Sequence, residues 1–158
     1  MRFWDYYALR KIRDVADYQF GRDVGKSLFP DDVEVRLSRR TGRIRYILLN
    51  GLLLATLRPT DGLFSLTVEG ATFLLSIVPP PRLRATVLAE ISSLIRRGGN
   101  VFAKHIIRAD PSIVPGEEVM VVDQEDSLLA VGRAVLNGEE MSLFKRGVAV
   151  KVRKGVEY

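Results

Sequence analysis

Cationic side chains are the residues of this sequence whose type and spacing point most directly to a chemistry. Six arginines and no acidic residue lie between Arg36 and Arg58, and five basic residues without an acid lie between Met141 and Val156. Arginine accounts for 18 of the 24 basic residues. Its planar guanidinium group binds phosphate in a bidentate manner and stacks on flat rings. Together with the net charge of +5, this pattern favours a polyanionic partner.

Side chains that would support catalysis or metal binding are sparse. With no cysteine and one histidine, the chain has no thiolate or histidine-based zinc centre, and we expect no cofactor. His105 is expected to be a half-buried structural residue. The acidic residues fall in adjacent pairs beside turns or helix starts, where carboxylates cap backbone amides: Asp31-Asp32, Glu117-Glu118 and Glu139-Glu140. We therefore expect no catalytic residue and no metal site.

The first half of the chain predicts helices around a small sheet. Apolar residues, Tyr7 among them, recur at three- and four-residue steps and predict a helix from Trp4 to Phe20. A strand over 33–38 is expected to turn Val33, Val35 and Leu37 inward. Two further strands flank Asn50-Gly51, a dipeptide typical of a type I′ hairpin turn.

A mostly apolar helix is then predicted over Val68–Ile77, and the prolines Pro79 to Pro81 end it. We place a domain boundary there, which gives domains 1–80 and 81–158. The fold class expected is α+β, with a small α/β domain followed by a β-barrel.

The second half of the chain predicts that barrel. A short strand over Arg84–Leu88 and a helix over Thr86–Arg97 precede the helix stop Gly98-Gly99. Short β-branched runs cut by Gly, Pro, Asn and Asp then predict strands, a pattern typical of a small, strongly bent sheet. These strands are expected over 101–108, 118–123, 128–136 and 148–153.

Several basic residues of the predicted barrel fall on exposed strand faces. Lys151 and Arg153 alternate with valines in the last strand, so we expect that replacing both would barely change stability. Phe102 and Lys104 share one face of an earlier strand, where an aromatic ring beside a cation suits a stacked base and its phosphate. An equally open alternative places Phe102 in the core. The candidate RNA contacts are Gly98, Gly99, Asn100, Phe102, Lys104, Lys145, Arg146, Lys151, Arg153 and the turn residues Arg39, Arg40 and Arg43.

The segments GGNVFAKHIIRADPSIVPGEEVMVVD, LLAVGRAV and GVAVKVRKG carry a family resemblance. Residues 98–156 resemble a PUA domain, a small RNA-binding barrel found in RNA-modifying enzymes. With VADYQFG, LFPDDVEV and TGRIRYILLNGLLLATLRPTDGLFSLTVEGA, nearly the whole chain resembles the C-terminal, non-catalytic part of archaeosine tRNA-guanine transglycosylases and archaeosine synthases. His105 departs from the aromatic residue expected at its position in this family.

The resemblance implies a protein that binds RNA, most specifically the acceptor stem and 3′ end of tRNA, without catalysis. A separately encoded catalytic subunit is the partner expected for such an RNA-holding arm. A protein-interaction or assembly module, for example on the ribosome, is the alternative, in which the charge only aids solubility. The sequence also predicts a cytoplasmic, soluble protein with no membrane partner, since no apolar run reaches the length of a membrane span. The high arginine content and lack of cysteine fit a thermophilic source.

Overall fold

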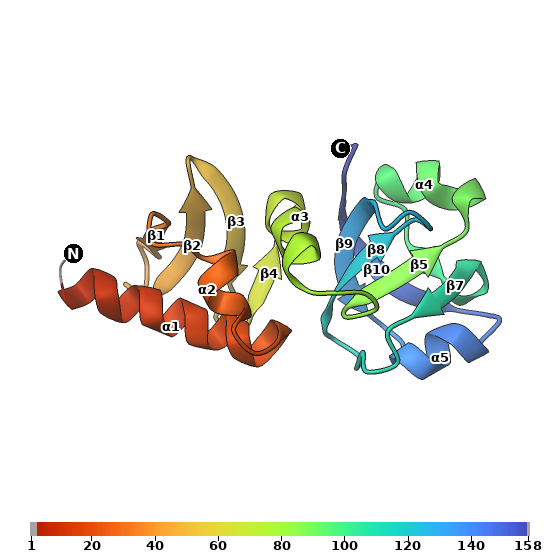
Figure 1. Ribbon diagram of the computed structural model, residues 1–158, viewed down its shortest axis with the longest axis horizontal. Coiled ribbons are helices and arrows are strands. Elements are labelled where there is room, and N and C mark those ends of the chain that lie inside the picture. Colours follow the sequence, from red (N-terminus) through yellow and green to blue (C-terminus); the bar gives the residue numbers. More distant parts are fainter. Residues whose placement is uncertain (1–2, 158) are drawn as a thin grey trace. The chain divides into compact units, whose positions relative to one another are not determined.

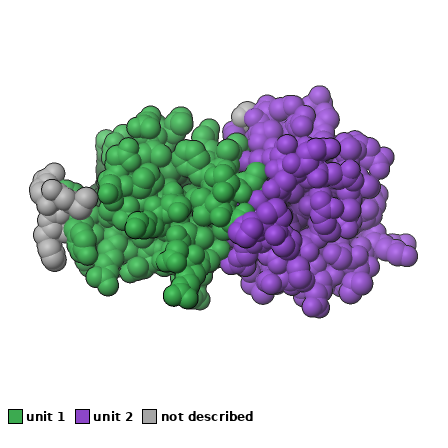
Figure 2. All heavy atoms as spheres, viewed as in Figure 1, with its two compact units in different colours: residues 1–78 green, residues 79–158 purple. Residues whose placement is uncertain are grey.

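The structure is a computed structural model that describes residues 3–157, with the main chain alone for Phe3 and Trp4. The predicted place of the Trp4 side chain in the first helix therefore lies outside the described residues. The chain forms two compact units, residues 1–78 and residues 79–158 (Figure 2). The division by packing falls two residues before the boundary predicted at Pro81. That each unit folds by itself stays a prediction.

The first unit contains helices and a four-stranded antiparallel sheet in the order β1-β2-β3-β4 (Figure 1). Its helices are α1 (Phe3–Phe20), α2 (Val24–Leu28) and α3 (Val68–Ile77), and its strands are β1 (Glu34–Leu37), β2 (Ile44–Leu49), β3 (Leu52–Leu57) and β4 (Phe64–Leu66). The predicted hairpin is confirmed: Asn50 and Gly51 have φ angles of 51° and 82° between β2 and β3. Both positive values are those of a type I′ turn.

The core of the first unit lies where the helices meet the sheet. Ile12, Ala16 and Phe20 of α1 are fully buried, as the helical spacing predicted, but Tyr7 is exposed. Phe29 meets Phe64 edge to face, with 5.2 Å between ring centroids. Helix α3 is amphipathic rather than mostly buried, because only its Gly70, Ala71 and Leu74 face the core.

The prediction that Val33, Val35 and Leu37 turn inward is wrong for Leu37. Val33 and Val35 are half-buried, and Leu37 is exposed. The reason is position: β1 is an edge strand, which pairs with β2 alone. Alternation in a sequence identifies two faces but does not reveal how far the covering helices extend over them.

The second unit is built on a six-stranded sheet in the order β6-β10-β9-β8-β5-β7 (Figure 1). Its strands are β5 (Arg84–Val87), β6 (Val101–Phe102), β7 (Ile106–Ala109), β8 (Glu118–Val122), β9 (Leu128–Ala134) and β10 (Val148–Gly155), and its helical segments are η1 (Ala89–Ile91), α4 (Ser92–Arg96), η2 (Ala103–His105) and α5 (Gly138–Leu143). Only the short η2 separates the two edge strands β6 and β7 in the chain. The sheet is therefore a nearly closed barrel, and the predicted α+β class is confirmed.

Two predicted elements of this unit are wrong in extent. The helix expected over Thr86–Arg97 begins only with η1, because Thr86 and Val87 belong to β5. The strand expected over 101–108 is broken by η2, where the Ala103 amide donates to the Gly147 carbonyl (2.9 Å) and His105 accepts from Leu88 (3.0 Å). These long-range hydrogen bonds override the local β-pattern. The face that Phe102 and Lys104 were expected to share with Ile106 and Arg108 therefore does not exist as one strand face.

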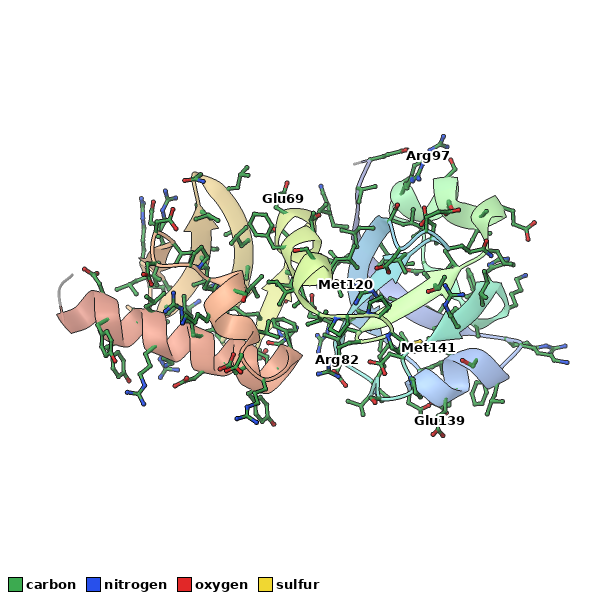
Figure 3. All side chains as sticks on the ribbon, viewed as in Figure 1. Glu69, Arg82, Arg97, Met120, Glu139 and Met141 are labelled. Atoms are coloured by element: carbon green, nitrogen blue, oxygen red, sulfur yellow. The ribbon has the colours of Figure 1, made fainter. Side chains whose placement is uncertain are left out.

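Apolar side chains fill the barrel. Val101, Val119, Val121, Leu129 and Val150 are fully buried. Met141 anchors α5 on this core (Figure 3), and a capping box between Asn137 and Glu140 starts that helix. Across residues 3–157, no helix combines the length and apolar character needed to cross a membrane.

Candidate nucleic-acid interface

The pairing of β6 with β10 brings two distant parts of the sequence side by side. Phe102 lies opposite Val148, and Val101 lies opposite Val150. The Asn100 side-chain oxygen accepts a hydrogen bond from the Val152 amide at 3.0 Å. Together with the Ala103–Gly147 bond, these contacts align residues 98–104 along residues 145–153. Nine of the twelve candidate RNA contacts therefore lie on two adjacent segments of one barrel.

The paired strands β6 and β10, with the residues that flank them, form what we call the β6–β10 ribbon. One end of this ribbon carries an aromatic–basic cluster, which we define as Phe102, Lys104, Phe144, Lys145 and Arg146. Phe102 is 41% exposed and Phe144 is 46% exposed. The three cationic side chains are exposed, and none of them forms an ion pair with a described residue. Phe102 is thus outside the core, and the cluster offers flat rings and uncommitted charge in one place.

Phe144 was missed by the sequence interpretation. It ends helix α5, and its amide donates to the Glu140 carbonyl at 2.8 Å. Its place directly before Lys145-Arg146-Gly147 was the signal available in the sequence. Gly147 has a φ of 91°, which favours glycine and ends the turn into β10.

The glycines at the other end of the ribbon have a structural task. Gly98 has a φ of 101°, and its amide donates to the Ile95 carbonyl at 2.9 Å. The Gly99 amide donates to the Leu94 carbonyl at 3.0 Å. Both amides thus end helix α4 and are not available as donors to a phosphate. Their carbonyls and the neighbouring exposed Arg97, which projects from this end of the helix (Figure 3), are what the loop presents. Arg97 is a second residue that the sequence interpretation omitted.

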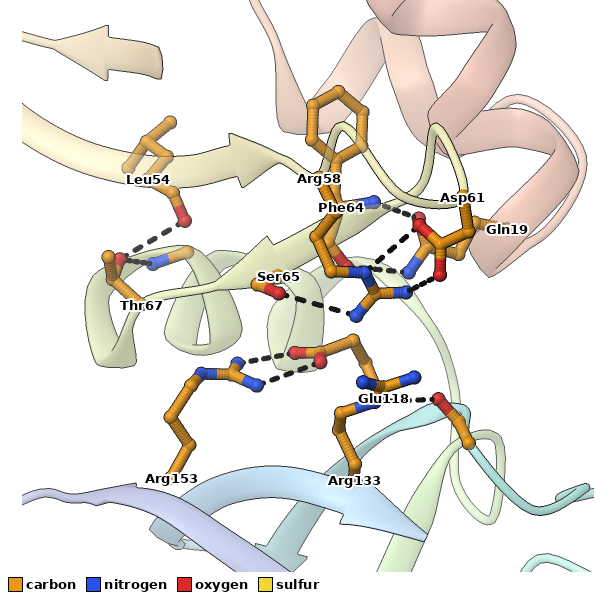
Figure 4. A network of polar contacts seen from close by, with 12 residues as sticks. Gln19, Leu54, Arg58, Asp61, Phe64, Ser65, Thr67, Glu118, Arg133 and Arg153 are labelled. Atoms are coloured by element: carbon orange, nitrogen blue, oxygen red, sulfur yellow. Dashed lines mark hydrogen bonds and ion pairs between the residues drawn. The ribbon is translucent and has the colours of Figure 1, made fainter. Parts of the chain in front are cut away.

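Arg153 is exposed, as strand alternation predicted, but its charge is paired within the barrel. Its guanidinium forms two hydrogen bonds with the Glu118 carboxylate, at 2.9 and 2.6 Å (Figure 4). The Glu118 side chain is 1% exposed and the Arg153 side chain 35% exposed. The pair spans from β10 to β8 over the intervening β9. The structure therefore gives a reason to expect a loss of stability when Arg153 is replaced, because the change would leave a buried carboxylate without its charge partner.

Lys151 remains exposed on β10, directly opposite Arg133 of β9. The Arg133 guanidinium donates to the Gly116 carbonyl at 3.1 Å (Figure 4). Two like charges directly opposite on adjacent strands repel each other. Glu118 faces Arg133 from the other side, whereas Lys151 forms no ion pair with a described residue and stays among the candidate contacts.

The arginines of the first unit occupy a tight turn between β1 and β2. The Ser38 hydroxyl accepts from the amides of Arg40 and Thr41, both at 3.3 Å. Arg39, Arg40 and Arg43 are exposed, and within the described part of the chain they form no ion pair. The turn is held by these two hydrogen bonds and its cations are unpaired within residues 3–157; its contact with RNA remains a prediction.

The predicted capping role of the acidic pairs is confirmed for Glu117 and Glu140, whereas Asp31 forms an ion pair. Glu117 accepts from the Val114 amide (2.9 Å), Glu140 caps α5, and Asp31 pairs with Arg13 (2.9 Å). Glu118 is the exception, since it is buried with Arg153. His105 is half-buried. Over residues 3–157, no group of three or more histidine or acidic side chains could hold a metal ion.

Comparison with known proteins assigns a family to each unit. Residues 84–156 match the model of the PUA domain, and residues 10–81 match the patch-forming domain C2 of tRNA-guanine transglycosylase. The chain is therefore a PUA-domain protein in which a transglycosylase-type C2 domain precedes the PUA barrel.

The relatives among curated proteins are archaeal enzymes. The chain is 47% identical over 150 residues to a tRNA-guanine(15) transglycosylase of Thermococcus kodakarensis, covering 95% of this chain and 26% of the relative. The identity to the enzyme of Thermoplasma acidophilum is 45%, over 94% of this chain and 23% of that one. The chain thus spans about a quarter of the length of these relatives and corresponds to their C-terminal part.

Solved structures show the same fold. A hypothetical protein of the hyperthermophilic archaeon Pyrococcus horikoshii superposes with a TM-score of 0.76 at 24% identity, covering 100% of this chain and 93% of that one. A conserved PUA-domain protein of Thermoplasma acidophilum gives a TM-score of 0.66 at 22% identity, over 96% and 89% of the two chains. The expected PUA fold and the relationship to archaeal transglycosylases are confirmed.

Proposed function

We propose that this protein binds RNA, most specifically tRNA, and does so without catalysing a reaction itself. The observation that carries the proposal is the aromatic–basic cluster, in which two exposed rings and three uncommitted cations meet at one end of the β6–β10 ribbon. Exposed rings stack on unpaired bases, while Lys and Arg neutralise phosphates. The names of the curated relatives, which act on tRNA, support tRNA as the RNA.

Within this proposal the contacts differ in kind. Lys104, Lys145, Arg146 and Lys151 supply charge to the phosphate backbone, which positions the RNA without reading its sequence. Phe102 and Phe144 supply stacking surfaces for bases at an unpaired end. The tRNA acceptor stem with its single-stranded 3′ end combines a duplex backbone with unstacked bases and therefore suits both kinds of contact.

We also propose that a separately encoded enzyme supplies the chemistry. The curated relatives carry about three quarters of their length outside the matched region, and the described residues of this chain contain no converging acid, base or metal ligands. The isolated protein should not exchange guanine into tRNA, with or without added zinc. Robust turnover by the purified chain alone would refute this part of the proposal.

A protein partner is the second candidate function, favoured by one observation. Leu143 is one of the most exposed apolar side chains of the second unit, next to Phe144, and such residues also suit a protein interface. Crosslinking of the protein in its own cells, followed by sequencing of the bound RNA, separates the two. Enrichment of tRNA 3′ ends supports RNA binding, whereas recovery of background RNA alone favours the protein partner.

A further inference from the structure

The two edges of the four-stranded sheet in the first unit differ in whether their outward main-chain groups are hydrogen-bonded. At the β4 edge, the Gln19 side chain accepts a hydrogen bond from the Phe64 amide (2.7 Å) and donates one to the Phe64 carbonyl (2.9 Å) (Figure 4). One side chain of α1 thus occupies the outward main-chain groups of Phe64 in that strand. Such a cover prevents another strand from pairing at an open edge.

The opposite edge, β1, has no equivalent cover from the described residues. The Ser38 amide bonds to the Arg43 carbonyl on the β2 side, so alternation along the strand directs the main-chain groups of Val35 and Leu37 away from β2. Their N–H and C=O groups are available to a further strand. The Val33 amide already donates to the Pro30 carbonyl, which leaves the Val33 carbonyl as its outward group.

We propose that a second copy of this chain pairs here, β1 against β1 in antiparallel orientation, with Val35 on the two-fold axis. Outward main-chain groups must meet outward main-chain groups, so only the odd-numbered residues Val33, Val35 and Leu37 can form the hydrogen-bonded pairs between the two copies. Placing Val35 opposite Val35 also places Glu34 of each copy opposite Arg36 of the other, in addition to the ion pair that Glu34 and Arg36 form within each chain. A shift of the register by two residues would set Glu34 against Glu34 or Arg36 against Arg36. Like charges directly opposite destabilise a strand pair, so charge selects the Val35-centred register.

The side chains on the other face of β1 support the same register. A groove of about 440 Å³ runs along β1 and α1, and its lining combines the apolar residues Ala8, Leu9, Val33 and Val35 with the acidic residues Asp5, Asp31 and Glu34. Leu37 is 38% exposed in the single chain. In the paired arrangement, Leu37 of each copy lies opposite Val33 of the other and on the same face. Its side chain therefore reaches the apolar part of the groove and removes both surfaces from water.

The expected association is weak. The strand has four residues, and the pairing joins each copy's outward groups through Val33, Val35 and Leu37 alone. Interfaces this small belong to the transient class, and we expect a dissociation constant on the order of 100 μM. The two-fold arrangement closes on itself and would yield a dimer with one continuous eight-stranded sheet, not a filament.

Reversing one charge at a time tests the register. In sedimentation equilibrium of the full chain, the Glu34→Arg and Arg36→Glu variants should each dimerise at least about tenfold more weakly than the natural protein, because both cross-strand pairs become repulsive. Mixing the two variants should restore association as a heterodimer, in which every opposed pair is complementary again. The double variant Glu34→Arg/Arg36→Glu should dimerise like the natural protein.

Each outcome of these experiments either supports or overturns the proposed pairing of β1 with β1. Recovery in the mixture cannot come from misfolded chains, so it supports the proposal even if a single variant is less stable on heating. A natural protein that stays monomeric up to about 1 mM, ten times the expected constant, would overturn it. Single variants that dimerise as well as the natural protein would overturn the β1 interface and its register.

Discussion

The guanidinium of Arg153 binds the buried carboxylate of Glu118 across the full width of strand β9, through hydrogen bonds of 2.9 and 2.6 Å. The contact joins the last strand of the barrel to β8. It also divides the basic residues of β10 into two functions. Arg153 holds the barrel together, whereas Lys151 on the same strand is exposed and is available for an anion.

Replacing Arg153 by Gln should destabilise the protein by about 2 to 3 kcal/mol. Loss of the cation leaves the Glu118 carboxylate buried without its charge partner, and the partial exposure of Arg153 keeps the cost below that of a fully buried pair. Urea denaturation of the full chain measures the change. Lys151→Gln is the matched control and should shift stability by less than about 0.5 kcal/mol. Equal effects of the two substitutions would contradict the assignment of Arg153 to the fold.

Replacing Gln19 by Ala should destabilise the first unit by about 1 to 2 kcal/mol, since the Phe64 amide and carbonyl both lose a partner. Hydrogen exchange of the Phe64 amide should accelerate at the same time. Gln124→Ala, which changes an exposed side chain of the second unit, is the control for losing a glutamine. An unchanged exchange rate at Phe64 would show that Gln19 does not protect the β4 edge.

Residues 79–158 should fold as an isolated fragment. This unit has its own buried core and its own nearly closed sheet. The fragment should therefore unfold in one cooperative transition and give a dispersed amide NMR spectrum. A spectrum typical of an unfolded chain would show that the two units depend on each other for stability.

Replacing Phe102 by Ala should weaken tRNA binding without changing its salt dependence. A stacked base loses about 1 to 3 kcal/mol when its aromatic platform is removed, and no counterion is involved. The control is Tyr18→Ala, an exposed aromatic residue on α1 of the first unit, which should leave the affinity unchanged. Equal losses in both variants would argue against a base stacked on Phe102.

Local chemistry explains which parts of this structure could be predicted from the sequence. Asn50-Gly51 specifies its turn through the positive φ angles it allows, and the Asn137–Glu140 capping box uses residues three apart. The break in the strand after Phe102 could not be predicted, because the long-range hydrogen bonds that hold η2 in place join it to Gly147 and Leu88. No local pattern contains those partners.

The candidate site, like the fold, could be predicted from the sequence only in part. Charge and aromatic content identified Phe102, Lys104, Lys145 and Arg146, and the β6–β10 pairing brings them together. The role of Arg153 could not be predicted, because it depends on the register of three strands, which places Glu118 within reach. The alternation of residues along a strand predicts on which face of the sheet a side chain lies. It does not predict which residues that side chain contacts.

The salt dependence of tRNA binding tests the central claim most directly. Binding of the full chain to labelled tRNA is measured over a range of salt concentrations for the natural protein and for the triple variant Lys104→Gln/Lys145→Gln/Arg146→Gln. If the aromatic–basic cluster binds phosphates, the triple variant should bind more weakly at low salt. Its slope of log affinity against log salt should be shallower by about two to three units. The control Lys11→Gln/Lys26→Gln, which removes two exposed cations from the first unit, should keep the natural slope. An unchanged affinity and slope in the triple variant would contradict the account.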